Sequence, residues 1–202
     1  QLIGLWITIH NLYNIVKTQQ TSDFHNKFQG HSAIVVCPGP SLSKNIDSYQ
    51  EAFDLLFKSV VHTTSLVIPG MQKNKWGRII NVTSVSVKEP LNYLVLSNSI
   101  RSAVVAWAKS LSVDLGPDGI TVNSILTGYF DTERIKELNK EKSKSLNISE
   151  AEVLDKMKSL VPASRLGRPE EYGYLVSFLS SDNAAYINGA SIPIDGGLLK
   201  SY

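Results

Sequence analysis

The pair Ser97 and Arg101 is the first feature of the sequence that could do chemistry. The two residues are four apart within Tyr93–Leu115, where we expect a long helix, so they share one helix face. A serine hydroxyl is a far weaker acid than a phenol, and arginine, with a pKa above about 12, cannot relay a proton. Arginine does bind phosphates and carboxylates, often through two parallel hydrogen bonds. We therefore expect Arg101 to bind an anion.

Both residues also have simpler interpretations, which the sequence leaves open. Arg101 could be a surface arginine paired with Glu or Asp, and Ser97 could be a small residue on the helix surface. Tyr93, one helical turn before Ser97, carries a phenol, but one turn displaces its backbone by about 6 Å, which is too far to replace a side chain at position 97. Packing of this aromatic ring on the core is the alternative for Tyr93.

Five more residues stand at or shortly after the ends of predicted strands: Thr83, Ser84, Gly128, Phe130 and Thr132. Open α/β sheets bind ligands at the carboxyl ends of their strands, so Ser84, which we expect beside Arg101, lies where a ligand would bind. In structural terms, Gly128 could form a strand-to-helix turn and Thr132 could be a helix N-cap.

A separate candidate lies earlier, in the turn Cys37–Ser41. Gly39 permits a close approach of the backbone to a phosphate, and Ser41, Ser43 and Lys44 could add donors. An ordinary turn into a helix, capped by Ser41 or Ser43, is the alternative.

The elements that would position these residues alternate between strands and helices. Apolar, β-branched runs predict strands at Ala33–Val36, Gly77–Ser84, Ile120–Ile125 and Ser191–Asp195. Apolar spacing and capping signals predict helices at Leu2–Val16, Tyr49–Met71, Tyr93–Leu115, from the capping box Ser149–Glu152 onward, and at Pro169–Leu179. Alternating elements of this kind imply parallel βαβ units, so the predicted fold class is α/β, with a parallel sheet between helices.

Two further details belong to this prediction. In Tyr49–Met71, the side chains expected to face inward are Phe53, Leu56, Val60 or Val61, and Thr64. The mixed charges of Lys136–Lys144 indicate a solvated helix face.

Composition limits the kind of protein. A chain of 202 residues with 43% hydrophobic and 19% charged residues fits a single globular domain. A net charge of +2 without basic stripes argues against a nucleic-acid partner, and Leu2–Val16 is too polar for a membrane span. The single Cys37 suits a reducing cytoplasm, and the four histidines lack the close partners of a metal site. We expect a cytoplasmic protein without a metal.

Most of the chain resembles the short-chain dehydrogenase/reductase family. The resemblance rests on blocks in the family's order and spacing, over about residues 50–202: Gly77–Ser84, Trp107–Leu111, Leu115–Asn123, Arg165–Glu171, Tyr186–Ala190 and Ile194–Gly197. A complete member opens with a strand and a glycine-rich loop that cradles the cofactor pyrophosphate. The sequence shows no such loop, so we expect a Rossmann-like sheet that lacks the usual first βαβ half.

The resemblance assigns catalytic roles and reveals departures from them. In the family, a tyrosine phenol transfers a proton, a lysine binds the cofactor ribose and lowers the tyrosine pKa, and a serine holds the substrate oxygen. Ser84 matches the serine, whereas Ser97 stands at the tyrosine position and Arg101 at the lysine position. The family's asparagine in the preceding helix falls near Leu56. The resemblance therefore implies impaired or altered chemistry, with Ser84, Ser97 and Arg101 as the catalytic-position residues.

The resemblance also implies a cofactor, NAD or NADP. Gly128 and the backbone near Phe130 would approach the nicotinamide carboxamide, and Thr132 would bond its amide or a phosphate; Gly39 and Thr83 complete the cofactor candidates. The family has Pro-Gly where this chain has Thr127-Gly128. The residue that would discriminate NAD from NADP is missing, so the choice between them stays open.

Residues 11–47 resemble a different group, the Gly-Pro-Ser-Leu region of pterin diphosphokinase-like and motility-associated glycosyltransferase-like proteins. On one account, residues 1–49 have a separate ancestry and join the dehydrogenase part, 50–202, near Asp47–Glu51, within one compact domain. On the other, Ala33–Val36 is the dehydrogenase's fourth strand, and the turn after it stands where the family's Asn-Asn-Ala-Gly loop belongs.

Three functions follow from these observations. The first is an oxidoreductase-family protein with altered NAD(P)-dependent chemistry on an unknown small molecule. The alternatives are a non-catalytic module that binds a nucleotide or a partner, and transferase-like nucleotide binding through Gly39–Lys44. Apolar residues on the two long central helices predict a homodimer or homotetramer: Phe57, Val61, Val104, Val105 and Trp107.

Overall fold

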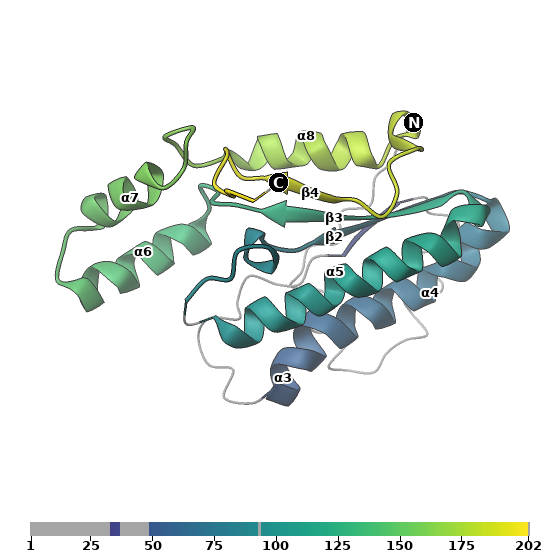
Figure 1. The fold of residues 1–202 in the computed structure, drawn as a ribbon, viewed down its shortest axis with the longest axis horizontal. Helices are drawn as coiled ribbons and strands as arrows, with labels where there is room; N and C mark the ends of the chain where they lie inside the picture. Colours follow the sequence, from purple (N-terminus) through teal and green to yellow (C-terminus); the bar gives the residue numbers. More distant parts are fainter. Residues whose placement is uncertain (1–32, 37–48, 93, 202) are drawn as a thin grey trace.

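The fold is a parallel four-stranded sheet with helices on both faces, as predicted (Figure 1). The computed structural model describes residues 33–36, 49–92 and 94–201, with only the backbone for 33–36. The described strands, in sheet order, are β1 (Ala33–Val36), β2 (Gly77–Val82), β3 (Ile120–Thr127) and β4 (Ser191–Ile194). Leu2–Val16, Tyr93 and the turn with Gly39 lie outside the described residues.

The register brings the carboxyl ends of the strands to one edge. Val36 is paired with Asn81 in β2, Val82 with Ile125 in β3, and Thr127 with Ile194 in β4. All four predicted strands are confirmed, although β2 ends two residues early and β3 continues two residues further. The residues that follow β2, β3 and β4 therefore meet along this edge.

One face of the sheet is covered by a long helical segment and by α5. The segment runs through α3 (Tyr49–Phe53), a π-helical turn η2 (Asp54–Lys58) and α4 (Ser59–Asn74), and α5 spans Val95–Leu115. Both predicted helices are confirmed, as is the inward orientation of Leu56, Val60 and Thr64, each 0% exposed. The expectation for Phe53 is wrong: the side chain is 44% exposed and stacks on Phe57 instead of reaching the sheet.

The opposite face is covered by α8 (Pro169–Leu179), as predicted. Two more helices, α6 (Glu133–Leu146) and α7 (Glu150–Ser159), project beyond the carboxyl ends of the strands (Figure 1). The capping box of Ser149 is present: its hydroxyl accepts from Glu152 N, and the Glu152 carboxylate accepts from Ser149 N. Short 3₁₀ turns are η3 (Val85–Val87), η4 (Gly116–Asp118) and η5 (Asp182–Ala184).

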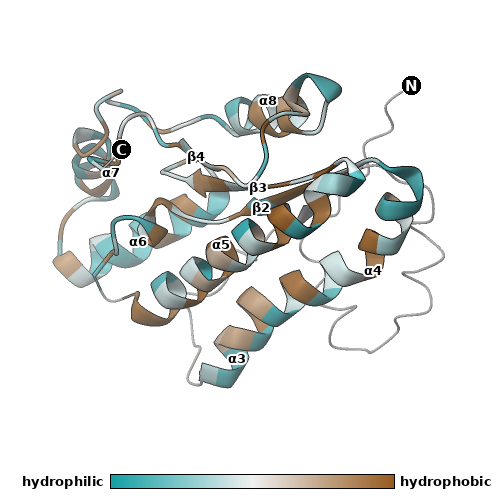
Figure 2. Ribbon diagram, turned by 45° about the vertical axis from the view of Figure 1, so that its right-hand side comes forward, coloured by the Kyte–Doolittle hydropathy of each residue, from teal (hydrophilic) through white to brown (hydrophobic). Residues whose placement is uncertain are grey.

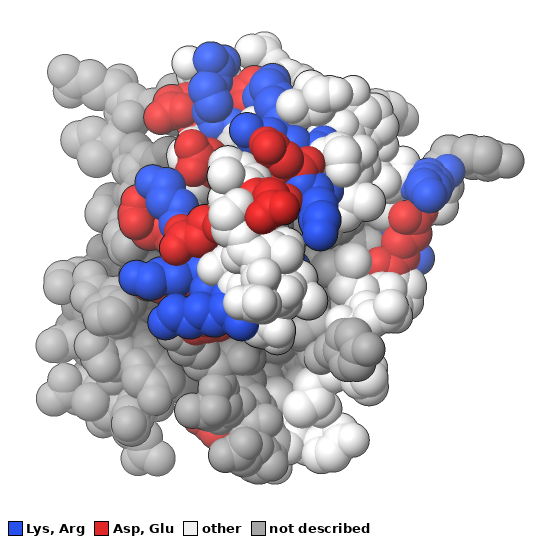
Figure 3. Space-filling view, turned by 90° about the vertical axis from the view of Figure 1, so that its left-hand side faces the viewer, with Lys and Arg blue, Asp and Glu red and all other residues white. Residues whose placement is uncertain are grey.

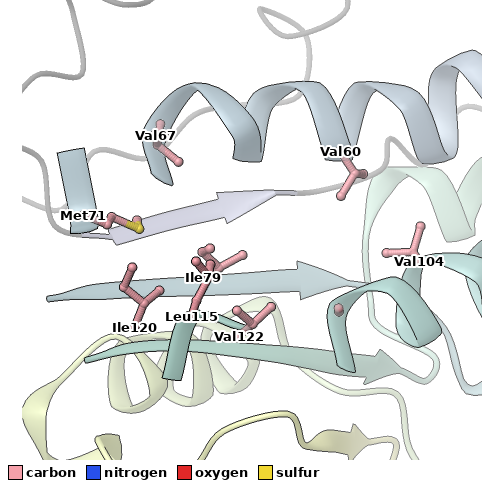
Figure 4. Packing of buried hydrophobic residues seen from close by; sticks show 9 residues of the cluster. Val60, Val67, Met71, Ile79, Val104, Leu115, Ile120 and Val122 are labelled. Carbon is pink, nitrogen blue, oxygen red and sulfur yellow. The ribbon is translucent and has the colours of Figure 1, made fainter. Parts of the chain in front are cut away.

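Two apolar clusters lie on the two faces of the sheet. Adjacent residues of β2 point to opposite clusters: Ile79 packs with Val60 and Val104 under α4 and α5, and Ile80 packs under α8. Figure 4 shows the first cluster, and the brown residues in Figure 2 follow the buried sides of α4 and α5. Burial of the sheet on both faces explains why nearly every residue of β2 and β3 is buried, including polar ones such as Asn81 and Asn123.

The surface agrees with a chain of low net charge. On the face in Figure 3, acidic and basic side chains are interspersed, and neither sign forms a continuous patch. No helix among the described residues is long and apolar enough to cross a membrane. Within the same ranges, no group of three or more His, Cys, Asp or Glu could hold a metal ion.

Candidate functional site

Thr83 and Ser84 follow β2 at the carboxyl edge, and their hydroxyls differ in use. Thr83 is buried, and its Oγ1 donates a hydrogen bond to Ile125 O at 3.0 Å, which ties β2 to β3. Ser84 is half-buried and extended, and its Oγ accepts from Ser86 N at 3.1 Å as the N-cap of η3. That bond occupies a lone pair of Ser84 and leaves its proton for a substrate oxygen.

Ser97 and Arg101 contact each other on the first two turns of α5. Arg101 Nε donates a hydrogen bond to Ser97 Oγ at 3.2 Å, and both residues are half-buried. The predicted shared helix face is therefore confirmed. Ser97 is not an isolated surface residue, because its oxygen accepts from the guanidinium.

Arg101 lies in a desolvated setting without a carboxylate partner among the described residues. Burial lowers the pKa of Arg101, and the nearby Tyr172 phenol opposes this effect by charge attraction. The alternative in which Arg101 pairs with Glu or Asp is not what the described part of the chain shows.

Leu56, near the family's asparagine position, is fully buried in η2. A leucine side chain offers no hydrogen-bond donor or acceptor. Leu56, Ser97 and Arg101 are therefore three departures from the residue types of the family.

Gly128 is required by the packing of two strand ends. A Cβ at Gly128 would lie 2.6 Å from Asp195 Cα, and Gly128 N donates to Ile194 O at 3.1 Å. This close packing accounts for a glycine at position 128 by a contact between strand ends, which differs from the strand-to-helix turn given as its structural alternative.

Phe130 and Thr132 also have structural roles. The buried Phe130 ring covers Gly167, and the backbone on either side of Phe130 bonds Gly167 through Tyr129 O and Asp131 N. Thr132 is the N-cap of α6, accepting from Ile135 N at 3.4 Å. Phe130 itself lines a pocket of about 130 Å³ with Tyr129, Ala163, Arg165, Gly167, Glu171, Ile194, Asp195 and Gly196.

Tyr172, which the sequence analysis missed, approaches the same edge from α8. Its hydroxyl lies 3.2 Å from Thr127 Oγ1, and its ring makes an edge contact with Phe130 at 5.3 Å between centroids. The only signal in the sequence was a tyrosine one turn into the helix that opens at Pro169. Arg101 and Tyr172 thus come from helices on opposite faces and lie within electrostatic range of each other.

Comparison with known proteins identifies the fold and the family. The family model described as enoyl-(acyl carrier protein) reductase matches residues 17–199. This match includes Ala33–Val36 and most of the segment with the second resemblance.

Individual relatives agree. The chain is 34% identical to the NADPH-dependent reductase BacG of Bacillus subtilis over 131 residues, 65% of this chain and 51% of that protein. It is 30% identical to the 3-oxoacyl-[acyl-carrier-protein] reductase FabG of Pseudomonas aeruginosa over 159 residues, 77% of this chain and 58% of that protein. The chain therefore spans about half the length of the curated relatives that it matches.

Solved structures show the same arrangement. The crystal structure of YwfH, an NADPH-dependent reductase involved in bacilysin biosynthesis, matches with a TM-score of 0.83 and 25% identity over 93% of this chain and 76% of that one. L-sorbose reductase of Gluconobacter frateurii, complexed with NADPH and L-sorbose, matches with a TM-score of 0.79 and 25% identity over 96% of this chain and 74% of that one. The chain belongs to the short-chain dehydrogenase/reductase family.

Proposed function

We propose that this chain is an NAD(P)-binding oxidoreductase-family protein in which proton transfer is impaired or altered. The observation that carries the proposal is the Ser97–Arg101 hydrogen bond, at the two positions where the family has its proton-transfer pair. A bound nicotinamide supplies or accepts hydride. Ser84 holds the substrate oxygen through its free proton, and Arg101 keeps its charge.

The cofactor is a nicotinamide dinucleotide, NAD or NADP, at the carboxyl edge of the sheet. Our proposed cofactor contacts after the end of β3 are Gly128, Phe130 and Thr132. Two further proposed contacts are Thr83, which follows β2, and Gly39, which follows β1 in the sequence. Relatives named as NADPH-dependent reductases support the class of cofactor. The match of the family model from residue 17 onward favours the account in which Ala33–Val36 is the family's fourth strand over a separate ancestry for 1–49.

Titration with NADH and with NADPH, followed by nicotinamide fluorescence, tests cofactor binding, and steady-state assays of carbonyl substrates test turnover. We expect saturable binding and little turnover, because loss of a positioned general acid costs about 10²–10⁴-fold in rate. If the chain bound neither NADH nor NADPH, the proposal would be wrong. Turnover of about 1–10³ per second would show that the chemistry is not impaired.

The double variant Ser97→Tyr, Arg101→Lys restores the residue types of the family. We expect it to gain turnover over the unmodified chain if only the proton-transfer pair is missing. The single variant Arg101→Lys is its control, since it lacks the phenol.

A non-catalytic module is the second candidate, and Leu56 favours it, because this residue near the family's asparagine position is fully buried and apolar. Such a module would keep its assembly state and cofactor affinity in the double variant, with no gain in turnover. We place the protein in the cytoplasm, in keeping with its single cysteine.

A further inference from the structure

Arg101 differs from every other arginine that the structure describes. Arg78, Arg134, Arg165 and Arg168 each form an ion pair with a carboxylate: Arg78 with Asp182, Arg134 with Glu137, and the last two with Glu171. Arg101 forms none with any described residue, although it is half-buried and desolvated. A charge in that setting is costly unless a partner compensates for it.

The one hydrogen bond that Arg101 makes with a described side chain fixes the direction of its guanidinium. Nε donates to Ser97 Oγ, and the planar group then presents Nη1 and Nη2 side by side. No hydrogen bond joins either of these two nitrogens to a described residue. Two parallel N–H groups at the end of a planar fork match the two oxygens of a carboxylate or phosphate.

The position of the fork points to a ligand of the sheet edge. Arg101 lies on the second turn of α5, which packs along β3, and η3 with its N-cap Ser84 packs against α5 as well. On the other side, the hydroxyl pair of Thr127 and Tyr172 stands at the end of β3. An oxyanion above this edge would be met by charge from Arg101 and by hydroxyl groups.

We propose that Ser97 and Arg101 together form an oxyanion-binding fork, in which Arg101 contacts a carboxylate or phosphate group and Ser97 is a positioning residue. This inference deepens the proposed function, since the oxyanion would belong to the substrate or the cofactor of that same site. Ser97 acts only through Arg101: it accepts from Nε and leaves the terminal nitrogens for the ligand.

The test follows the Nε–H resonance of Arg101 by NMR in ¹⁵N-labelled protein, assigned by its loss in Arg101→Lys. The probes are inorganic phosphate and acetate, added at constant ionic strength against chloride. We expect a saturable shift of the Arg101 resonance with at least one probe, and none with chloride alone. No saturable shift with either probe would overturn the proposal.

Variants separate positioning from a structural role. Ser97→Ala should weaken probe binding about 10-fold, the lower end of the effect of losing one hydrogen bond to a charged group, while Ser97→Thr should stay within about 2-fold. Ser110→Ala is the matched control, since Ser110 is an exposed serine on α5 that also bonds four residues back. A Ser97→Ala variant that folds, by its thermal melting, and binds the probe as tightly as the unmodified chain would show that Ser97 does not position Arg101.

Pre-saturation with NADPH distinguishes the two sources of the oxyanion. Loss of the probe-induced shift assigns the fork to a cofactor phosphate, and a retained shift assigns it to a substrate carboxylate or phosphate. Binding of probe without binding of either nicotinamide cofactor would remove the proposed function and leave the fork. Cofactor binding without any probe response would leave the proposed function and overturn the oxyanion-binding fork.

Discussion

At the scale of single residues, charge pairing separates structural groups from candidate functional ones. Glu171 is a structural case: its carboxylate accepts from Arg165 Nη1 and Nη2 at 2.8 and 2.7 Å and from Arg168 N at 2.8 Å. These bonds stabilise the ionised form and lower the pKa of Glu171 from 4.5 to about 2, with the Arg165 bond as the largest cause. The pair closes the loop that leads into α8.

Replacement of Glu171 by Gln should therefore destabilise the fold in a pH-dependent manner. A folded-state pKa below the unfolded value means that the stabilisation is complete above about pH 4.5 and is lost as the pH falls through about 2. The difference in urea midpoint between the unmodified chain and Glu171→Gln should be largest at pH 7 and should shrink between pH 4.5 and 2. Glu170→Gln, at the exposed neighbouring position, is the control. A difference that stays constant from pH 7 to pH 2.5 would contradict the assignment.

At the scale of elements, asparagine side chains hold the end of the chain on the sheet. Asn123 of β3 is 1% exposed; its Nδ2 donates to Ile187 O at 2.7 Å and its Oδ1 accepts from Ala190 N at 3.0 Å. Asn188 adds a second clamp, with Oδ1 accepting from Val122 N and Nδ2 donating to Ser112 O. These bonds set the path of 187–190 into β4, whose end packs on Gly128.

Asn123→Ala should lower the free energy of unfolding by about 1–3 kcal/mol, because it leaves the Ile187 carbonyl and the Ala190 N–H without a partner. Urea denaturation gives this value from the midpoint and slope. Asn183→Ala, at an exposed position of η5, should change it by less than about 0.5 kcal/mol. Equal effects of the two substitutions would show that the Asn123 bonds contribute nothing.

At the scale of the whole molecule, we propose the outer face of α5 as the surface used in assembly. Of the residues in the dimer prediction, Val104 is fully buried within the core, and Phe57 and Trp107 pack against it. The outward residues of α5 are small or apolar instead: Ser99, Ala103, Ala106, Ser110 and Val113 are all exposed. Small residues allow two helices to approach closely, so this face supports the predicted two-fold dimer better than the residues first named.

Light scattering at micromolar concentration should therefore give twice the chain mass of 22.2 kDa. Ala106→Glu should convert the dimer to a monomer without unfolding it, because the side chain is exposed in one chain and glutamate is a good helix former. Ser177→Glu on the exposed side of α8 is the control. A monomeric unmodified chain, or an unchanged mass for Ala106→Glu, would refute this interface.

Much of the architecture is determined locally, and the sequence alone was enough to predict it. Short apolar runs rich in β-branched residues favour buried strands. Helices begin and end at local signals, such as the Ser149 capping box, Pro169 and Gly116-Pro117, which act on backbone groups within a few residues. The spacing of Ser97 and Arg101 on one helix face is equally local, and so is their departure from the family's residue types. The ends of strands were harder to predict from the sequence. For example, β3 runs to Thr127 because its pairing with β4, far along the chain, continues to Ile194.

Tertiary structure alone decided what the candidate site residues do. Whether Arg101 meets a carboxylate depends on which side chains of distant elements surround it, and no described one does. The packing of Phe130 on Gly167 and the approach of Tyr172 to Thr127 likewise join residues that lie far apart in the chain. The periodicity of a sequence shows which face of an element is apolar, but not which partner covers that face. The partner determines whether a polar group has a structural role or is left to bind a ligand.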